Sequence, residues 1–267
     1  MKNIPPVAVH AEVANIFSNA ILVHMSQTPF DEYGRLASEL NNFTELAGRY
    51  RFQKEAEKYL LYYLLEKMSL SPQDDLLEIG CGAGNLLIPL SFFVHSATGI
   101  DHPNLLARIK NRVPKDSDSL TLIPGNFLST EVPGTFSRIV IYSVIQYLRD
   151  ADEMLAFIRK ATDLLRPGGK MLIGDIPNRD IKDRFLNSEQ GKDFSATWQE
   201  QVAANQKEGR LEHQSPMTDG PLVAIDDALV EKVLEMLQEL HVRAQRVSQP
   251  ETLAFCFTRE DLVIEKG

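Results

Sequence analysis

Apolar residues follow two alternating patterns along this chain. Short runs such as Leu76–Ile79 and Ile139–Ile145 are apolar at nearly every position, which is typical of strands buried on both faces of a sheet. Longer stretches between them carry apolar residues at every third or fourth position, which predicts amphipathic helices. The alternation between residues 74 and 177 indicates parallel βαβ units, so we expect an α/β fold.

The pattern gives approximate bounds for each element. Strands are expected at Asp74–Ile79, Ala97–Ile100, Leu120–Ile123, Ile139–Ile145, Met171–Ile176, Val242–Val247 and Leu253–Phe257. Helices are expected at Arg49–Met68, Leu86–Phe93, Leu105–Val113, Ala151–Leu165, Phe194–Lys207 and Ala228–Leu240.

Four segments emerge from this reading. Residues 1–73 form a helical cap, residues 74–177 a ligand-binding core, and residues 178–221 a polar insertion over the acceptor site. Residues 222–267 supply the last helix and the closing strands of the core. Connecting segments beside a sheet edge often carry specificity, so we expect the cap and the insertion to shape the acceptor pocket.

A glycine-rich turn is the densest local signal. The first strand of the core runs into Gly80, Gly82 and Gly84, and an apolar helix follows. Glycine lets a ligand approach the backbone closely, and a helix start favours a polar or anionic group. Asp101 follows the next expected strand, where a carboxylate accepts the hydroxyl protons of a ribose. These features predict a nucleoside-bearing cofactor.

The glycine spacing separates two kinds of cofactor. Dinucleotide sites typically read GxGxxG. This chain reads GxGxG and has Asn85 where the third glycine of the dinucleotide pattern would stand.

The ordered motifs from residue 74 to 177 resemble the class I S-adenosylmethionine (SAM)-dependent methyltransferase family. They are Asp75–Gly84, Gly99-Ile100-Asp101, Gly125-Asn126-Phe127, Tyr142–Tyr147 and Leu164–Gly169. The resemblance implies a Rossmann-like fold with a mostly parallel seven-stranded sheet and helices on both faces. It also implies SAM as cofactor and S-adenosylhomocysteine (SAH) as product.

The resemblance assigns cofactor contacts to nine residues. Gly80, Gly82 and Gly84 would line the methionine part of SAM, with Glu78 near its amino group. Asp101 would hold the ribose, and Ser143 would lie beneath the cofactor. The adenine would be surrounded by His102, Asn126 and Phe127. Asn126 stands where an aspartate is common, but its carbonyl oxygen still accepts a hydrogen bond from the adenine amino group.

Two residues are candidates for the chemistry. Asp175 comes at the end of the fifth strand, where it is placed to act as a base. An equally weighted alternative is that its carboxylate organises the adjoining loop. Tyr147 would orient the acceptor or simply pack. Many small-molecule members carry a histidine where this chain has Gln146-Tyr147, so a base at that position is not implied. Tyr50 and Arg51 are candidates to close over the cofactor carboxylate, and Trp198 to stack on an acceptor.

The acceptor is less defined by the sequence. The segments Gly174–Asn178, Ser248–Glu251 and Cys256–Ile264 look like bacterial methyltransferases found with surface-glycan biosynthesis, which points to a sugar or sugar-containing metabolite. Two other functions stay open. One is a non-catalytic SAM- or SAH-binding protein. The other is an NAD-dependent sugar-nucleotide enzyme, although Tyr147 is followed by Ala151 rather than by the lysine of a Tyr-x-x-x-Lys pair.

Composition limits the kinds of partner that we expect this protein to bind. The formal net charge of −9, with 28 Lys+Arg against 37 Asp+Glu, disfavours nucleic acid. The histidines and the two cysteines, Cys81 and Cys256, show no metal-ligand spacing, so we expect no metal. Because the sequence shows no secretory pattern and no apolar run of about 20 residues, we expect a cytoplasmic protein without a membrane partner. Whether it is a monomer or a homodimer stays open.

Overall fold

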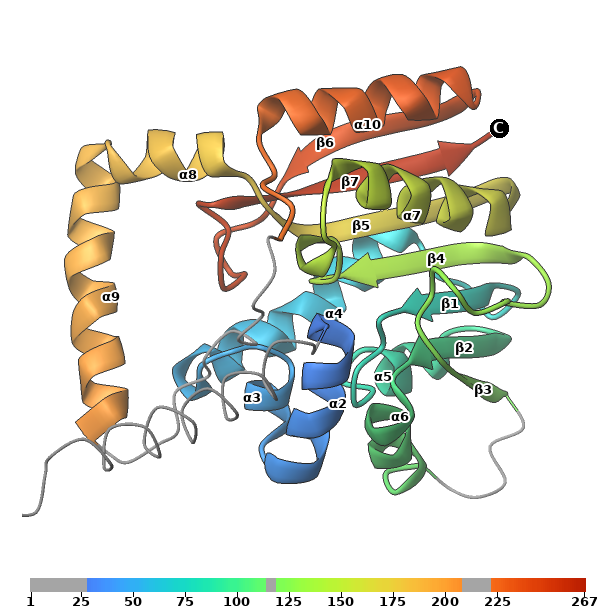
Figure 1. The fold of residues 1–267 in the computed structure, drawn as a ribbon, viewed down its shortest axis with the longest axis horizontal. Coiled ribbons are helices and arrows are strands. Elements are labelled where there is room, and N and C mark those ends of the chain that lie inside the picture. Colours follow the sequence, from blue (N-terminus) through green and yellow to red (C-terminus); the bar gives the residue numbers. More distant parts are fainter. Residues whose placement is uncertain (1–27, 114–118, 208–221) are drawn as a thin grey trace, which may run out of the picture.

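A twisted seven-stranded sheet forms the centre of the computed structural model, which describes residues 28–113, 119–207 and 222–267 (Figure 1). The strands are β1 (Asp75–Ile79), β2 (Ser96–Asp101), β3 (Leu120–Pro124), β4 (Phe136–Tyr142), β5 (Leu165–Pro177), β6 (Val242–Ser248) and β7 (Arg259–Lys266). Their order is β3-β2-β1-β4-β5-β7-β6, and β7 runs antiparallel to both of its neighbours. The predicted mostly parallel seven-stranded sheet is therefore confirmed.

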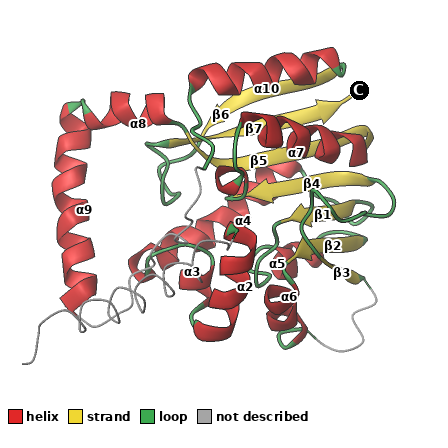
Figure 2. Ribbon diagram, viewed as in Figure 1, coloured by secondary structure: helices red, strands yellow, loops and turns green. Residues whose placement is uncertain are grey.

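Helices cover both faces of the sheet (Figure 2). They are α2 (Pro29–Glu39), α3 (Phe43–Leu46), α4 (Lys54–Met68), α5 (Leu87–Ser91), α6 (Pro103–Lys110), α7 (Ala151–Leu164), α8 (Arg179–Leu186), α9 (Glu189–Lys207) and α10 (Asp227–Glu239), with short 3-10 turns η1 (Arg51–Gln53) and η2 (Ile145–Tyr147). Side chains that accept backbone N–H groups define several helix starts, namely Thr28, Asp150, Asn178 and Asp226.

Alternation along the strands divides the core into two layers. Leu77, Ile141 and Ile173 point to the side where α7 and α10 pack. Their neighbours Leu76, Val140 and Leu172 point to the opposite side, against α4. Successive strand side chains face opposite sides, and both sides are covered, which explains why these runs are apolar throughout.

The predicted strand Leu253–Phe257 is wrong. That segment forms consecutive turns, in which the amides of Leu253 and Thr258 donate to the carbonyls of Pro250 and Phe255. The closing strand β7 begins two residues later and carries Glu260 and Asp261 into the interior, where both are buried. Glu260 and Asp261 interrupt the apolar pattern that would have predicted this strand. They are tolerated in the interior because the fold brings hydrogen-bonding partners to them.

The described part of the insertion forms α8 and α9, and α9 stands apart from the sheet in Figure 1. It is held by an aromatic cluster, in which the ring centroid of Trp198 lies 5.5 Å from that of Tyr50, 5.1 Å from Phe52 and 5.9 Å from Phe194. Residues 1–27 of the predicted cap and 208–221 of the insertion lie outside the described residues.

Replacing Ile141 with alanine tests the core. Ile141 is fully buried between β1, β5 and the α7 layer, so Ile141→Ala should lower the free energy of unfolding by about 2–5 kcal/mol. Urea denaturation monitored by circular dichroism measures this loss. Phe92→Ala is the control, because Phe92 is 81% exposed and its loss should change stability by less than about 0.5 kcal/mol. Equal effects would contradict the assignment of the core.

Candidate active site

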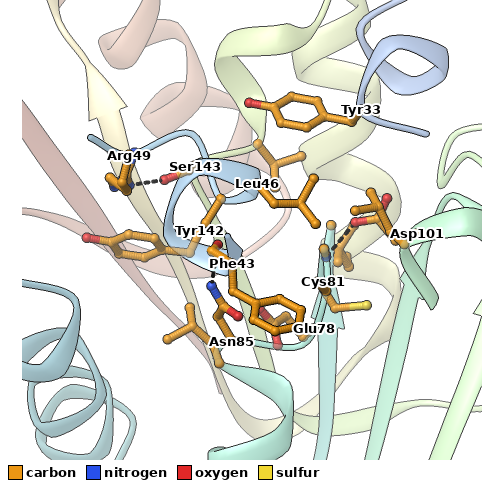
Figure 3. A pocket seen from close by; sticks show the side chains of 18 of the residues that line it. Tyr33, Phe43, Leu46, Arg49, Glu78, Cys81, Asn85, Asp101, Tyr142 and Ser143 are labelled. Carbon is orange, nitrogen blue, oxygen red and sulfur yellow. Dashed lines mark hydrogen bonds between the residues drawn. The ribbon is translucent and has the colours of Figure 1, made fainter. Parts of the chain in front are cut away.

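A cavity of about 850 Å³ lies at the carboxyl ends of β1, β2 and β4 (Figure 3). The strand order changes direction here, because β2 and β3 lie on one side of β1 and β4 lies on the other. Ligands of open α/β sheets bind at such a point. The predicted site residues that line the cavity are Glu78, Gly80, Gly82, Asp101, Asn126, Phe127, Ser143 and Tyr147. The volume is within the range of pockets that bind small molecules and cofactors.

The glycine turn gives the cavity a floor that a ligand can approach closely. A side chain built at Gly82, where φ is +53°, would meet no atom within 4 Å. Gly84 does not line the cavity, because its Cα faces the hydrophobic core at Ile109. The amides of Gly80, Gly82 and Gly84 already donate to Ile100 O, Asp101 Oδ2 and Cys81 O. The turn therefore offers close approach rather than free donors.

Asp101 is oriented by backbone groups. Its Oδ2 accepts the Gly82 N–H at 2.7 Å, and its Oδ1 accepts the His102 N–H at 2.6 Å. Burial raises the pKa of this carboxyl, while the two backbone hydrogen bonds act in the opposite direction. Each oxygen keeps a lone pair for a further donor, and hydroxyl groups are suitable donors.

Glu78 is a buried carboxylate that lacks a hydrogen-bond partner at one of its oxygens. It is 3% exposed at the end of β1, and its Oε2 has no hydrogen-bond partner. Burial raises the pKa of this carboxyl well above its usual value, and the charge of Asp101 adds to the effect. A buried polar atom without a partner is costly and requires an explanation. A cationic or N–H-bearing ligand group at the cavity floor would supply one.

The three residues expected around the adenine occupy different places. Phe127 is buried against Phe157, with ring centroids 4.8 Å apart, and the Asn126 Oδ1 accepts the Leu128 N–H at 2.9 Å. Both line the cavity. His102 does not. Its imidazole packs against α2, where its ring centroid lies 5.0 Å from that of Phe30.

The cap forms the opposite wall. Tyr33 on α2, Phe43 and Leu46 on α3, and Arg49 all line the cavity (Figure 3). Among the hydrogen bonds that connect this cap to the core, Tyr33 Oη donates to Tyr147 Oη at 2.7 Å, and Asn85 Nδ2 donates to the Phe43 carbonyl at 3.0 Å. The sequence pattern gave no signal for these residues, because the docking of α2 and α3 alone brings them to the site.

Asp175 lies outside the cavity wall and is 1% exposed. Its Oδ2 accepts from Arg49 at 2.5 Å, from Arg259 at 2.7 Å and from the Ser143 hydroxyl. Its backbone amide donates to Asp261. The carboxylate is thus engaged with two guanidinium groups and a hydroxyl and does not line the cavity, so its role as a base stays a prediction. The alternative, a carboxylate that organises the surrounding structure, fits these contacts.

The other sequence candidates also lie away from the cavity. Tyr50 and Trp198 belong to the aromatic cluster, and neither lines the cavity. The side chain of Arg51 is outside the described part of the structure. No described residue of 178–207 lines the cavity. The neighbouring Arg49, rather than Tyr50, lines the cavity.

No group of His, Cys, Asp or Glu in the described ranges could hold a metal ion. None of the helices seen in the structure is long and apolar enough to cross a membrane.

Solved structures share this fold over most of the chain. One is NodS from Bradyrhizobium japonicum WM9, an N-methyltransferase in complex with SAH. It is 19% identical in sequence to this chain with a TM-score of 0.55, and the match covers 90% of this chain and 99% of NodS. Magnesium protoporphyrin IX methyltransferase from Synechocystis PCC 6803 with bound SAM is 13% identical, with a TM-score of 0.55 over 93% and 96%. The match extends over nearly the whole chain, so these methyltransferase structures share the fold that the motifs predict.

Sequence comparison then gives the family. The family model for Nodulation protein S (NodS) matches residues 50–188, just over half of the chain. This chain belongs to the NodS family. An uncharacterized methyltransferase of Bacillus cereus is 30% identical over 134 residues, which are 49% of this chain and 61% of that protein. Chondramide synthase cmdD of Chondromyces crocatus is 32% identical over 139 residues, 50% of this chain and 4% of the synthase.

Glu78→Gln tests the carboxylate without a partner. Because burial holds the pKa of Glu78 above its unfolded value, its contribution to stability is greatest at low pH and declines as the pH rises from the unfolded value through the folded one. Glu78→Gln should therefore stabilise the ligand-free protein, and the gain should grow as the pH rises above the ordinary pKa of a glutamate towards the raised pKa of Glu78. Thermal unfolding across this range measures it. A gain that shrinks with pH would contradict the assignment.

Asp175→Asn tests the organising role. Removing a charge that balances the buried guanidinium of Arg49 and the partly buried one of Arg259 should lower the unfolding free energy by about 3–5 kcal/mol. Glu265→Gln is a matched control, because Glu265 pairs with Lys170 at an exposed site, where the loss should be below about 1 kcal/mol. Urea denaturation compares the two variants. Wild-type stability with reduced turnover would instead support Asp175 as a base.

Proposed function

We propose that this protein transfers the methyl group of SAM to a nitrogen atom of a small-molecule acceptor. The observation that carries the proposal is the juxtaposition of Glu78 and Asp101 on one cavity floor with the open Gly82 between them. Membership of the NodS family supports the same chemistry, since a NodS structure is described as an N-methyltransferase.

The residues present fit SAM. The unpartnered Glu78 Oε2 suits the amino group of the methionine part, and the spare lone pairs of Asp101 suit the two ribose hydroxyls. Phe127 and Asn126 would flank the adenine, and Gly80 and Gly82 would let the methionine part approach the backbone. The bound cofactor supplies an electrophilic methyl group on its sulfonium, so no covalent protein nucleophile is needed.

The protein's own contribution is orientation and the exclusion of water. Phe43 and Leu46 of the cap line the cavity and belong to the apolar cluster that includes Ala83 of the glycine turn, and an apolar wall there would keep water from the reacting groups. Ser143 is fixed by Asp175 and Arg49 at the end of β4. Tyr147 follows at η2, where its hydroxyl faces the cavity and can orient an acceptor. Orientation alone can lower a barrier by about 7–11 kcal/mol.

A sugar-containing metabolite is the acceptor class that we propose to test first. The cavity wall includes the aromatic rings of Tyr33, Phe43, Tyr59 and Tyr62. Rings that combine an apolar face with a hydroxyl suit ligands of mixed polarity. The same wall suits other small amphipathic amines, so the acceptor assay needs a panel.

We further propose a reducing, cytoplasmic setting for this reaction. Both Cys81 and Cys256 are free thiols, and free cysteines are typical of proteins in reducing compartments.

The dehydrogenase alternative has less support. Asn85, at the third-glycine position of a dinucleotide turn, is engaged with the Phe43 carbonyl and with Arg112. A non-catalytic SAM-binding protein would use the same floor but would not need an acceptor to enter beside the cofactor.

Asp101→Ala tests the cofactor site. Loss of a carboxylate that accepts ribose hydroxyls should weaken SAM binding about 10–100-fold, because hydrogen bonds to charged groups are worth about 1.5–3 kcal/mol. Calorimetric titration with SAM measures the affinity. Asp152→Ala, an exposed acidic position on α7, is the control and should bind as wild type does.

Thermal-shift assays separate the alternatives. SAM should stabilise the wild-type protein whereas NAD should not. Transfer of tritium from methyl-labelled SAM to an amine panel would then exclude the non-catalytic function. Stabilisation by NAD alone, or unchanged SAM affinity in Asp101→Ala, would contradict the proposal.

A further inference from the structure

Two tyrosine hydroxyls meet at the cavity wall. Tyr33 comes from α2 of the cap, and Tyr147 comes from η2 after β4. Tyr33 Oη donates to Tyr147 Oη at 2.7 Å, and the rings meet edge to face with centroids 5.3 Å apart. Both side chains are partly buried and line the cavity. The pair therefore places two oxygen atoms at the cavity surface in a fixed relative position.

The pair faces the middle of the cavity rather than one end. The charges of both Arg49 and Asp101 act on the Tyr33 hydroxyl, so both lie within electrostatic reach of it. Figure 3 shows Arg49 with Ser143 on one side of the cavity, Asp101 on the other, and Tyr33 on the wall above. Tyr33, which is hydrogen-bonded to Tyr147, is therefore within electrostatic reach of both the ribose position proposed at Asp101 and the wall at Arg49.

The hydrogen-bonding capacity of the pair is specific. The Tyr33 proton is committed to Tyr147, which leaves the Tyr147 proton as the free donor and the Tyr33 oxygen as a free acceptor. Burial raises the pKa of Tyr33 well above its usual value, and the neighbouring Tyr147 adds to the effect. The Tyr33 hydroxyl therefore stays protonated at neutral pH. It can accept an N–H hydrogen bond but cannot take up a proton as a base.

We propose that Tyr33 and Tyr147 act as one unit that positions the acceptor nitrogen, and that the acceptor binds as a neutral amine. This inference rests on the proposed function. An N–H group of the acceptor donates to the tyrosine oxygens, which leaves the nitrogen lone pair directed elsewhere. That lone pair forms the new C–N bond, and the bonding pair of the broken C–S bond remains on sulfur. The nitrogen keeps its protons, so the product leaves as an ammonium ion and no enzyme base is needed.

The test uses Tyr33→Phe, Tyr147→Phe and the double variant. Tyr63→Phe is the matched control, because it also removes a hydrogen-bonded tyrosine hydroxyl, here one donating to Asp261 at 2.6 Å, but does so away from the cavity. The acceptor probes are glucosamine, ethanolamine and benzylamine, with glucose as a hydroxyl counterpart. Transfer of tritium from methyl-labelled SAM measures turnover, and calorimetry measures the affinity for SAH.

Each single variant should lower kcat/KM for an accepted amine by about 10–100-fold, since each removes one member of a positioning unit. The double variant should lose little more than either single variant, because residues that act together are not additive. SAH affinity should change less than about threefold. The wild-type rate should rise with pH as the acceptor ammonium ion ionises, and Tyr63→Phe should keep wild-type turnover.

Several results would overturn the inference. Wild-type turnover in both single variants would remove the pair from acceptor binding. Additive losses would show that the two hydroxyls act separately, and an equal loss of SAH affinity would assign them to the cofactor. Transfer to glucose but to none of the amines, with SAH still bound, would refute the amine class. Failure of the wild-type protein to bind SAM or SAH would instead contradict the proposed function itself.

Discussion

The ion pair between Arg49 and Asp175 is the interaction on which the site depends. It joins the segment after α3 to the end of β5, across 126 positions of sequence, and both side chains are buried. Burial is the largest single effect on the pKa of the arginine and lowers it, but the charge and hydrogen bond of Asp175 act together with Tyr142 and Tyr147 to raise this pKa above its usual value. Since the same arginine also reaches Ser143 at the cavity wall, one contact fixes both the cap and the edge of the sheet.

The strand ends are shaped around this pair. Ser143 and Asp175 both adopt positive φ values, +59° and +63°, at the ends of neighbouring strands. Such backbone is unfavourable for residues other than glycine and persists only where surrounding contacts enforce it. Here Asp261 accepts the Asp175 amide, and Arg259 binds the Asp175 carbonyl and carboxylate. Asp175 is thus fully engaged with the protein, whereas Glu78 on the same edge has an oxygen without a partner. This contrast separates a carboxylate that maintains the fold from one available to a ligand.

The sequence was sufficient to predict the features that depend on local pattern. Apolar runs predicted the parallel strands, and the glycine turn with Asp101 predicted the position of the cavity floor. It was insufficient where a residue's role depends on tertiary contacts. Gly84 and His102 fit the motif by position, but packing against Ile109 and α2 turns them away from the cavity. Strand β7 was not predicted because the charged residues Glu260 and Asp261 interrupt its apolar pattern. In the structure Glu260 accepts from Arg246 and Asn178, and Asp261 accepts from Tyr63 and Gln249.

The boundary of the family match has a structural meaning. The NodS match begins at residue 50, and so includes the glycine turn, Asp101 and Tyr147. Four cap residues of the cavity wall, Tyr33, Phe43, Leu46 and Arg49, precede it, whereas the α4 residues Tyr59 and Tyr62 lie within it. The matched segment therefore carries the floor that fits the cofactor and the α4 part of the wall, while α2, α3 and Arg49 come from outside that segment. The family assignment therefore does not describe Tyr33, Phe43, Leu46 and Arg49, although all four line the same cavity as Glu78 and Asp101.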